Sequence, residues 1–326
     1  MLKEARFYEP RKNSAVKCML CPHECLINES KNGICLIRKN IKGKLFQTAY
    51  GELSSFAIDP IEKKPLYHFH PSSSILSIGT NGCNFRCDFC QNWHISTLQT
   101  PRQEASPAEL AEKAKEAGCV GIAFTYNEPL IWYEFVSDCA AEFKKQGLKN
   151  VIVSNGYINQ SPLKELIPLI DAANIDLKGF TESFYKDVTG GLEPVKNTIK
   201  TLYESGVSVE VTNLVIPGRN DSKEDFEAMC EWLASVSIDI PLHLSAYFPA
   251  YKSKERPIDP ETIINMKKIA KKHLNYVYAG NLRHEKNDSF CPHCKALLVK
   301  RSGYKVESYL KTNRCTECGK QLYFCV

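Results

Sequence analysis

Long apolar runs are missing from this sequence of 326 residues. No run approaches the roughly 18 apolar residues that a membrane-spanning helix needs, and the polar start, MLKEARFYEPRKNS, contains no signal-peptide core. Internal repeats and low-complexity segments are missing as well, so the sequence predicts neither a repeat array nor a long disordered linker. Hydrophobic residues make up 43% and charged residues 24% of the chain, as in ordinary globular proteins. We therefore expect a soluble, cytoplasmic protein with no membrane segment.

Negative charge is scarce at both ends of the chain, although the net charge is only +5. Residues 1–50 hold ten Lys or Arg against four Asp or Glu, and residues 291–326 hold seven against two. The middle of the chain is therefore net acidic. Basic ends can attract anionic partners, but no aromatic-basic pattern accompanies them here. We expect solvated lysine surfaces and no nucleic-acid partner.

Cysteine, by contrast, is abundant, with 15 residues. Without a secretory signal a disulfide framework is not expected, and clustered cysteines more often bind metal. Eleven of the 15 fall into three clusters. The other four are expected to be buried or incidental thiols, and they are Cys119, Cys139, Cys230 and Cys325.

Strand-like and helix-like segments alternate through the middle of the chain. Amphipathic segments predict helices, and residues 106–118 are an example, with Ser106 as N-cap and Glu109 in the capping-box position. Strands separated by helices pair in parallel. We therefore expect an α/β fold, a partial (β/α)6-type TIM barrel, with a doubly wound open sheet as the alternative. The seven predicted strands lie within residues 75–83, 120–129, 150–156, 172–179, 207–218, 241–249 and 275–280.

Composition divides the chain into four parts. The cysteine-rich ends differ from the alternating middle, and a proline-punctuated stretch separates the first end from the middle. In that stretch, Lys63 and Lys64 are expected to face solvent. The predicted parts are a metal-binding N-terminal unit at 1–50, a connector at 51–73, the barrel at 74–287 and a zinc-ribbon-like tail at 288–326.

One short loop, GTNGCNFRCDFCQNW at residues 79–93, contains Cys83, Cys87 and Cys90 at the spacing C-x3-C-x2-C. Three thiolates do not complete a tetrahedral zinc site, unless His94 supplies the fourth ligand. A [4Fe–4S] cluster can take three cysteines and leave one iron open to an outside ligand. The loop therefore favours an iron–sulfur cluster over zinc.

The tail contains two C-x2-C pairs, CPHC and CTEC, separated by 20 residues. Two such pairs suit a single tetrahedral zinc ion. The segment between them reads as two strands around Ser302 and Gly303, so the tail is expected to be a zinc ribbon. The predicted zinc ligands are Cys291, Cys294, Cys315 and Cys318.

The N-terminal unit contains four cysteines at the spacing C-x2-C-x3-C-x9-C. Four thiolates suit one closed site, which holds either structural zinc or a second iron–sulfur cluster. The spacing departs from the ferredoxin run, which favours zinc, and His23 is an alternative ligand. The predicted ligands are Cys18, Cys21, Cys25 and Cys35.

The three-cysteine loop, with Phe89 before its last cysteine and a strand before its first, resembles the radical S-adenosylmethionine (SAM) superfamily. The resemblance implies that the amino and carboxylate groups of SAM bind the open iron of a [4Fe–4S] cluster. Reductive cleavage of SAM then gives a 5′-deoxyadenosyl radical, which abstracts hydrogen from a substrate. The cofactor carries this chemistry, and the resemblance assigns no catalytic side chain.

Three further motifs, TYNEP (125–129), VSNG (153–156) and IDLKG (175–179), end consecutive predicted strands. The first keeps only Glu-Pro of the superfamily's GGEP-like turn, and the last resembles a D-x-K segment of glycyl-radical activases. The resemblance implies SAM contacts here. The alternatives are that Glu128 caps a helix, that an Asp–Lys pair is structural, and that His243 is a core histidine. The predicted SAM contacts are Asn127, Glu128, Ser154, Asn155, Asp176, Lys178 and His243.

The whole chain resembles the AmmeMemoRadiSam-system radical SAM enzymes, which are similar to pyruvate formate-lyase activating enzymes. DPIEKKPLYHF and CQNW carry the more specific part of this resemblance. It implies a one-electron donor such as flavodoxin or ferredoxin and AMMECR-type and Memo-type associates. It leaves the substrate unassigned, and the analogy with glycyl-radical activases suggests a partner protein in which a glycine loses hydrogen. The alternatives are modification of a small molecule or of a non-glycyl protein target and, from another class, a zinc-binding nucleic-acid or scaffold protein.

Overall fold

The computed structural model describes residues 1–98, 100–282 and 285–326. Its centre is an eight-stranded sheet in the order β16-β15-β14-β13-β12-β11-β9-β8. All neighbours from β9 to β16 in this order are parallel, so the predicted α/β fold with a parallel sheet is confirmed. The parallel strands are β9 (Ser74–Gly79), β11 (Gly121–Phe124), β12 (Lys149–Ser154), β13 (Ala172–Asp176), β14 (Ser208–Val215), β15 (Leu242–Ala246) and β16 (Val277–Gly280).

The stretch predicted to be a connector contributes an eighth strand. Strand β8 (Ser55–Pro60) pairs antiparallel with β9, from Ser55 opposite Gly79 to Pro60 opposite Ser74. Pro60 lacks a backbone N–H, which an edge strand tolerates. The sheet therefore ends at β8 on one side and at β16 on the other.

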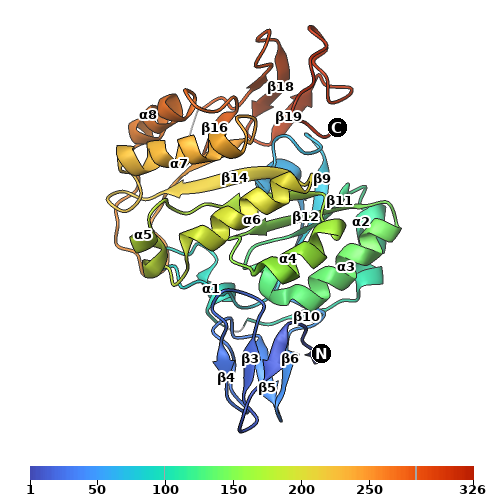
Figure 1. Cartoon of the computed structure of the whole chain (residues 1–326). Coiled ribbons are helices and arrows are strands. Elements are labelled where there is room, and N and C mark those ends of the chain that lie inside the picture. Colours follow the sequence, from blue (N-terminus) through green and yellow to red (C-terminus); the bar gives the residue numbers. More distant parts are fainter. Residues whose placement is uncertain (99, 283–284) are drawn as a thin grey trace.

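Helices fill the connections between the parallel strands, and Figure 1 shows α3, α4, α6 and α7 stacked along one face of the sheet. The capping box predicted at Ser106 and Glu109 is present at the start of its helix. The α-helices are α1 (Trp93–Ser96), α2 (Pro107–Glu116), α3 (Tyr133–Lys145), α4 (Gln160–Leu166), α5 (Glu182–Asp187), α6 (Leu192–Glu204), α7 (Lys223–Val236) and α8 (Pro260–Ala270), and the 3-10 turns are η1 (Ile61–Lys63), η2 (Pro129–Trp132) and η3 (Ile167–Leu169).

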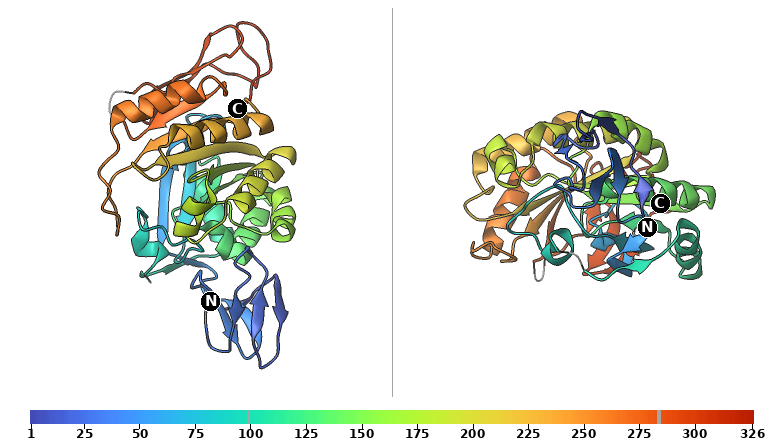
Figure 2. Two further views of the ribbon diagram at one scale, coloured as in Figure 1. Left: turned by 60° about the vertical axis from the view of Figure 1, so that its left-hand side comes forward. Right: turned by 90° about the horizontal axis from the view of Figure 1, so that it is seen from below.

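The N-terminal unit, called the head from here on, consists of two small antiparallel sheets, β1-β6-β5 and β2-β3-β4. It lies at one end of the molecule and the tail at the other (Figures 1 and 2). A buried ion pair at 3.1 Å joins Arg38 of the head to Glu134 of α3. The head strands are β1 (Lys3–Glu4), β2 (Tyr8–Pro10), β3 (Val16–Cys18), β4 (Leu26–Ile27), β5 (Arg38–Ile41) and β6 (Lys44–Gln47), and a further short pair joins β7 (Glu52–Leu53) to β10 (Gln103–Glu104).

The tail is a three-stranded antiparallel sheet of β17 (Ser289–Phe290), β18 (Leu297–Ser302) and β19 (Lys305–Ser308). The two strands predicted around Ser302 and Gly303 are confirmed. The predicted boundaries after residues 50, 73 and 287 stay predictions. Within the described ranges, no helix is both long enough and apolar enough to cross a membrane.

Candidate functional site

The predicted motifs meet in a cavity of about 460 Å³ at the carboxyl edge of the parallel sheet. The loop after β9 supplies Cys83, Cys87 and Cys90 to its wall, and the ends of β11, β12 and β13 supply polar side chains. Because the carboxyl ends of parallel strands share one edge, motifs distant in sequence converge there. Six of the seven predicted SAM contacts line this cavity: Asn127, Glu128, Ser154, Asn155, Asp176 and Lys178.

The cysteine loop is pressed against the head at Gly82. Its φ of +96° lies in a region that side chains rarely adopt. A Cβ atom at this position would stand 2.3 Å from the carbonyl oxygen of Cys35. Only glycine therefore allows the loop and the head to approach so closely.

Hydrogen-bonding groups lie beside two of the three sulfur atoms of the loop, those of Cys83 and Cys90. The Phe85 N–H lies 3.4 Å from Cys83 Sγ, and Asn155 Nδ2 lies 4.0 Å from the same sulfur. The Ser96 hydroxyl oxygen is 3.2 Å from Cys90 Sγ. Such donors stabilise negative charge on a ligating sulfur.

Burial keeps the thiols of Cys83 and Cys87 protonated until a cation binds. It raises the pKa of Cys83 well above its usual value and that of Cys87 to about 11. Metal binding would therefore release protons here. Three thiols around one cavity, with donors beside them, fit an iron–sulfur cluster held by three cysteines. The alternative zinc ligand, His94, is exposed and does not join them in a tight ligand group.

Glu128 connects the ends of two strands. Its carboxylate accepts hydrogen bonds from the Leu130 N–H at 3.0 Å, the Ser154 hydroxyl at 2.7 Å and the Asn155 N–H at 2.8 Å. Burial raises its pKa to about 7, although the two backbone N–H groups oppose the shift. Glu128 thus caps η2, as the alternative interpretation expected, and it also forms part of the cavity wall.

Asp176 and Lys178 form an ion pair, with Lys178 Nζ 2.8 Å from an Asp176 carboxylate oxygen. Burial alone would lower the pKa of Lys178, but the charge of Asp176 and the hydrogen bond to it raise the pKa above its ordinary value. The ammonium therefore stays charged on the cavity wall. The structural pair named as an alternative is present, and it faces the same cavity as the cysteines.

Asn127 and Asn155 tie the strand ends to the cysteine loop. Asn127 Nδ2 donates to the Gly82 carbonyl at 2.9 Å, and its Oδ1 accepts from the Thr80 N–H at 3.2 Å. Asn155 Nδ2 donates to Asn84 Oδ1 at 2.8 Å. Both amides therefore fix the loop that carries the cysteines.

His243 is the predicted contact that does not line the cavity. It is buried, and its Nε2 lies 2.7 Å from a Glu210 carboxylate oxygen. This is the environment of a core histidine. Its role in binding SAM stays a prediction that the placement does not favour.

Sequence reasoning missed a polar cluster at the cavity wall, to which Lys64 and Tyr126 belong. Lys64 Nζ lies 2.6 Å from the Asp59 carboxylate, and the Tyr126 hydroxyl donates to the same carboxylate at 2.7 Å. The Lys64 side chain is 3% exposed, against 50% for Lys63, so the expectation of solvent is wrong for Lys64. The signal in the sequence was the run DPIEKK, but its meaning depends on β8 pairing with β9.

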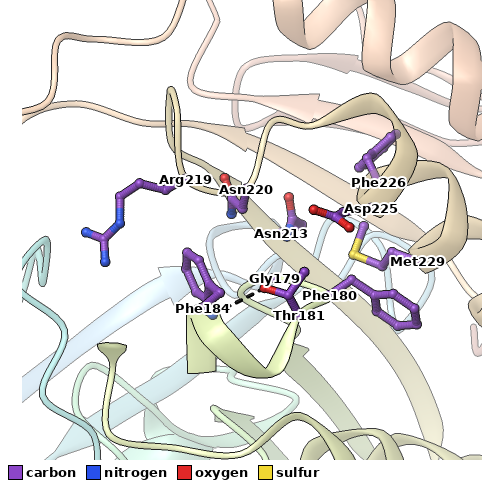
Figure 3. Close-up of a pocket in the computed structure, with 10 residues that line it drawn as sticks. All are labelled: Gly179, Phe180, Thr181, Phe184, Asn213, Arg219, Asn220, Asp225, Phe226 and Met229. Carbon is purple, nitrogen blue, oxygen red and sulfur yellow. Dashed lines mark hydrogen bonds between the residues drawn. The ribbon is translucent and has the colours of Figure 1, made fainter. Parts of the chain in front are cut away.

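A narrower pocket lies between the turn after β13 and the start of α7 (Figure 3). Gly179 and Phe184 lie on one side of it, and Asn220 and Phe226 lie on the other. None of the predicted metal ligands or SAM contacts lines this pocket, so the larger cavity is the candidate site.

The two remaining cysteine groups differ in their geometry. In the tail, Cys291 Sγ lies 3.7 Å from Cys318 Sγ, Cys294 Sγ lies 3.6 Å from Cys315 Sγ, and all four sulfurs are within 4.8 Å of one another. This spacing suits a single metal ion. The head cysteines do not form so tight a group among the described residues.

Comparison with known proteins agrees with this geometry. The Radical SAM superfamily matches residues 77–233, which include the cysteine loop and the strand ends of the cavity. The chain is 40% identical to the uncharacterized protein MJ0808 of Methanocaldococcus jannaschii, over 98% of this chain and 99% of that protein.

Two more distant similarities concern part of the chain. It is 26% identical to the pyruvate formate-lyase-activating enzyme of Clostridium pasteurianum over 48% of this chain and 67% of that enzyme. The crystal structure of a radical SAM methyltransferase from Sphaerobacter thermophilus shares the fold, with a TM-score of 0.52 and 15% identity over 65% of this chain and 67% of the other.

Proposed function

The chain belongs to the radical SAM superfamily, and from this premise we propose that Cys83, Cys87 and Cys90 hold a [4Fe–4S] cluster whose open iron binds SAM. Membership of the superfamily implies the cluster and SAM and an enzyme of radical chemistry. The observation that carries the residue assignment is that the three cysteines and six polar residues from three strand ends line one cavity. When bound, the cofactors supply a 5′-deoxyadenosyl radical that abstracts hydrogen from the substrate.

The chain's own side chains hold SAM in this proposal. We propose that the Lys178 ammonium binds the carboxylate of SAM and that the strand-end turn at Asn127 and Glu128 binds its ammonium group. The position of all three residues on the cavity wall supports this. Ser154 and Asn155 supply the polar edge between them. The aromatic rings of Phe85 and Phe89 are buried and line the cavity beside the cysteines, so they exclude water from the reacting atoms.

We propose an activase-like reaction on a protein substrate, in which a glycine of a partner loses hydrogen. The similarity to a pyruvate formate-lyase-activating enzyme supports this proposal. Modification of a small molecule is the alternative, and the enclosed polar cluster at Lys64 favours it. An electron-resonance signal of a glycyl radical in a candidate partner, dependent on this enzyme and SAM, supports the first. Formation of 5′-deoxyadenosine with no such radical supports the second.

The wider setting is proposed from the resemblance of the whole chain to AmmeMemoRadiSam-system enzymes. We propose a cytoplasmic enzyme with AMMECR-type and Memo-type associates and a flavodoxin or ferredoxin as electron donor. The open sheet is taken as a partial (β/α)6-type barrel, and the tail as a zinc ribbon. The tight spacing of the four tail sulfurs supports zinc there.

The proposed function is tested by SAM cleavage. The enzyme is reconstituted anaerobically, mixed with SAM and dithionite, and assayed for 5′-deoxyadenosine. Wild-type protein is expected to form it, and Cys83→Ala to lose it. Cys325→Ser, at a half-buried free cysteine outside the three clusters, is the matched control. Equal activity in Cys83→Ala would refute the assignment of the loop.

A further inference from the structure

The head cysteines gather three chain segments at one place. The hairpin of β3 and β4 sets two of them opposite each other, with the Cys18 N–H donating to the Cys25 carbonyl at 3.0 Å. Cys21 lies in the turn of that hairpin. Cys25 Sγ lies 3.7 Å from the point where a Cβ on Gly33 would stand, which brings the turn containing Cys35 to the hairpin. These side chains are buried or half-buried, so a metal there is shielded from solvent.

The spacing of the cysteine sulfurs distinguishes a site for one zinc ion from a site for a [4Fe–4S] cluster. Thiolates around one zinc ion crowd together because each is about 2.3 Å from the same ion, and the four tail sulfurs have this crowding. In a [4Fe–4S] cluster each cysteine binds a different iron, so the sulfurs stand farther apart. Over the described ranges, neither the head cysteines nor the loop cysteines form a tight group. The head therefore resembles the cluster loop, not the tail.

The head also touches the cluster loop directly. The Arg86 guanidinium donates to the Ile34 carbonyl of the head and, at 2.7 Å, to the Cys83 carbonyl of the loop. His23 Nε2 lies 2.8 Å from the Asn84 carbonyl oxygen. The Cys35 carbonyl fills the space that a side chain at Gly82 would need. Three contacts thus join the head directly to the loop that contains Cys83, Cys87 and Cys90, with no helix or strand between them.

We propose that the head cysteines hold a second [4Fe–4S] cluster, which passes electrons to the cluster of the loop. Of the two metals that the sequence left open at the head, zinc and an iron–sulfur cluster, this proposal chooses the cluster, and it rests on the proposed function for its electron acceptor. The step moves one electron and no atoms. A reduced donor of the ferredoxin or flavodoxin class is oxidised by one electron, and the head cluster gives the same electron to the loop cluster.

The first test counts metal after the loop ligands are removed. The triple variant Cys83→Ala, Cys87→Ala, Cys90→Ala leaves the head intact. After anaerobic reconstitution, wild-type protein is expected to bind about eight iron atoms and the triple variant about four, with a reduced-cluster electron-resonance signal. Zinc or no metal at the head of the triple variant would overturn the inference. Retained zinc in the tail shows that the variant is folded.

The second test removes the head ligands. Cys21→Ser with Cys35→Ser is expected to bind about four iron atoms, while Cys325→Ser keeps the wild-type count. With dithionite, the double variant still forms 5′-deoxyadenosine. With a reduced flavodoxin as the sole electron donor, the double variant is expected to form no 5′-deoxyadenosine, and a wild-type rate would overturn the relay.

The two proposals can fail separately. If the head binds no iron but the wild-type enzyme forms 5′-deoxyadenosine, only the inference of a second cluster is overturned. If the head binds iron but the wild-type enzyme forms no 5′-deoxyadenosine, the relay and the proposed function are both overturned.

Discussion

Gly82 is the residue at which the cysteine loop and the head come closest. The methyl group of an alanine there would clash with the Cys35 carbonyl oxygen. The alanine would also have to adopt the positive φ of Gly82, which is unfavourable for a residue with a side chain. Gly118 has a similar φ of +64°, but a methyl group there meets nothing within 4 Å. The two positions therefore separate backbone strain from steric clash.

Gly82→Ala is expected to lower the free energy of unfolding by about 1–3 kcal/mol more than Gly118→Ala, because overpacking adds to the strain common to both. Chemical unfolding under anaerobic conditions measures the difference. If both variants lost the same free energy of unfolding, the head would have moved away from residue 82 without an energetic cost.

Glu128 gives a pH-dependent prediction. Burial raises its folded pKa to about 7, above its ordinary value of 4.5. The stability that a protonated carboxyl contributes is fully present below pH 4.5 and is lost as the pH rises through 7. Glu128→Gln is expected to show a shallower loss of unfolding free energy across this window. Glu116→Gln, at an exposed site on α2, is the control, and a profile of Glu128→Gln that matches wild type would count against the buried carboxyl.

At the scale of elements, buried apolar runs made the parallel strands predictable. Each run from β9 to β16 is long enough to read as a strand and is followed by turn residues. Strand β8 was not predictable, because Ser55–Pro60 alternates between partly buried and exposed residues and pairs with a strand that follows η1 and a turn. Tertiary pairing, not local pattern, makes it a strand.

The site follows the same division. Strand ends and cysteine spacing predicted three cysteines and six polar residues that line the cavity, since parallel strands bring their ends together. The Asp59–Lys64–Tyr126 cluster was not predictable, because it needs β8 in place. Tyr126 takes a φ of +73°, where the superfamily turn has glycine. The burial of His243 against Glu210 likewise depends on the packing of neighbouring strands.

The segment after η1 anchors the tail to the sheet through His68. Its ring nitrogens lie 2.6 Å from the Tyr323 carbonyl oxygen and 2.7 Å from the Tyr278 hydroxyl, and its ring stacks on Phe324 at 3.8 Å. Burial lowers its pKa to about 3, from an ordinary 6.5. Between about pH 3 and pH 6.5, His68 is therefore protonated in the unfolded chain and neutral in the folded chain.

Unfolding free energy is accordingly expected to fall as the pH drops from about 6.5 towards 3, and His68→Gln to reduce that slope. Equilibrium unfolding at several pH values measures it. His94→Gln, at an exposed ring, should keep the wild-type slope. If His68→Gln kept the wild-type dependence of unfolding free energy on pH, His68 would not be its cause.

At the scale of the whole molecule, each end carries a cysteine group and the sheet between them carries a third. The tail sulfurs are spaced for one ion. Cys291→Ser with Cys294→Ser is expected to lose about one zinc per chain and no iron, and to expose the tail to limited proteolysis because structural zinc supplies folding energy. Elemental analysis checks this, and loss of iron from that variant would place a cluster in the tail instead.

The most direct measurement is electron resonance of the loop cluster with and without SAM. The variant Cys21→Ser with Cys35→Ser isolates that cluster from any metal at the head. Its reduced spectrum is expected to be that of a [4Fe–4S] cluster and to change when SAM is added, because the proposed function has SAM bind the iron that no cysteine binds. A spectrum without a cubane signal, or one that SAM leaves unchanged, would contradict the account.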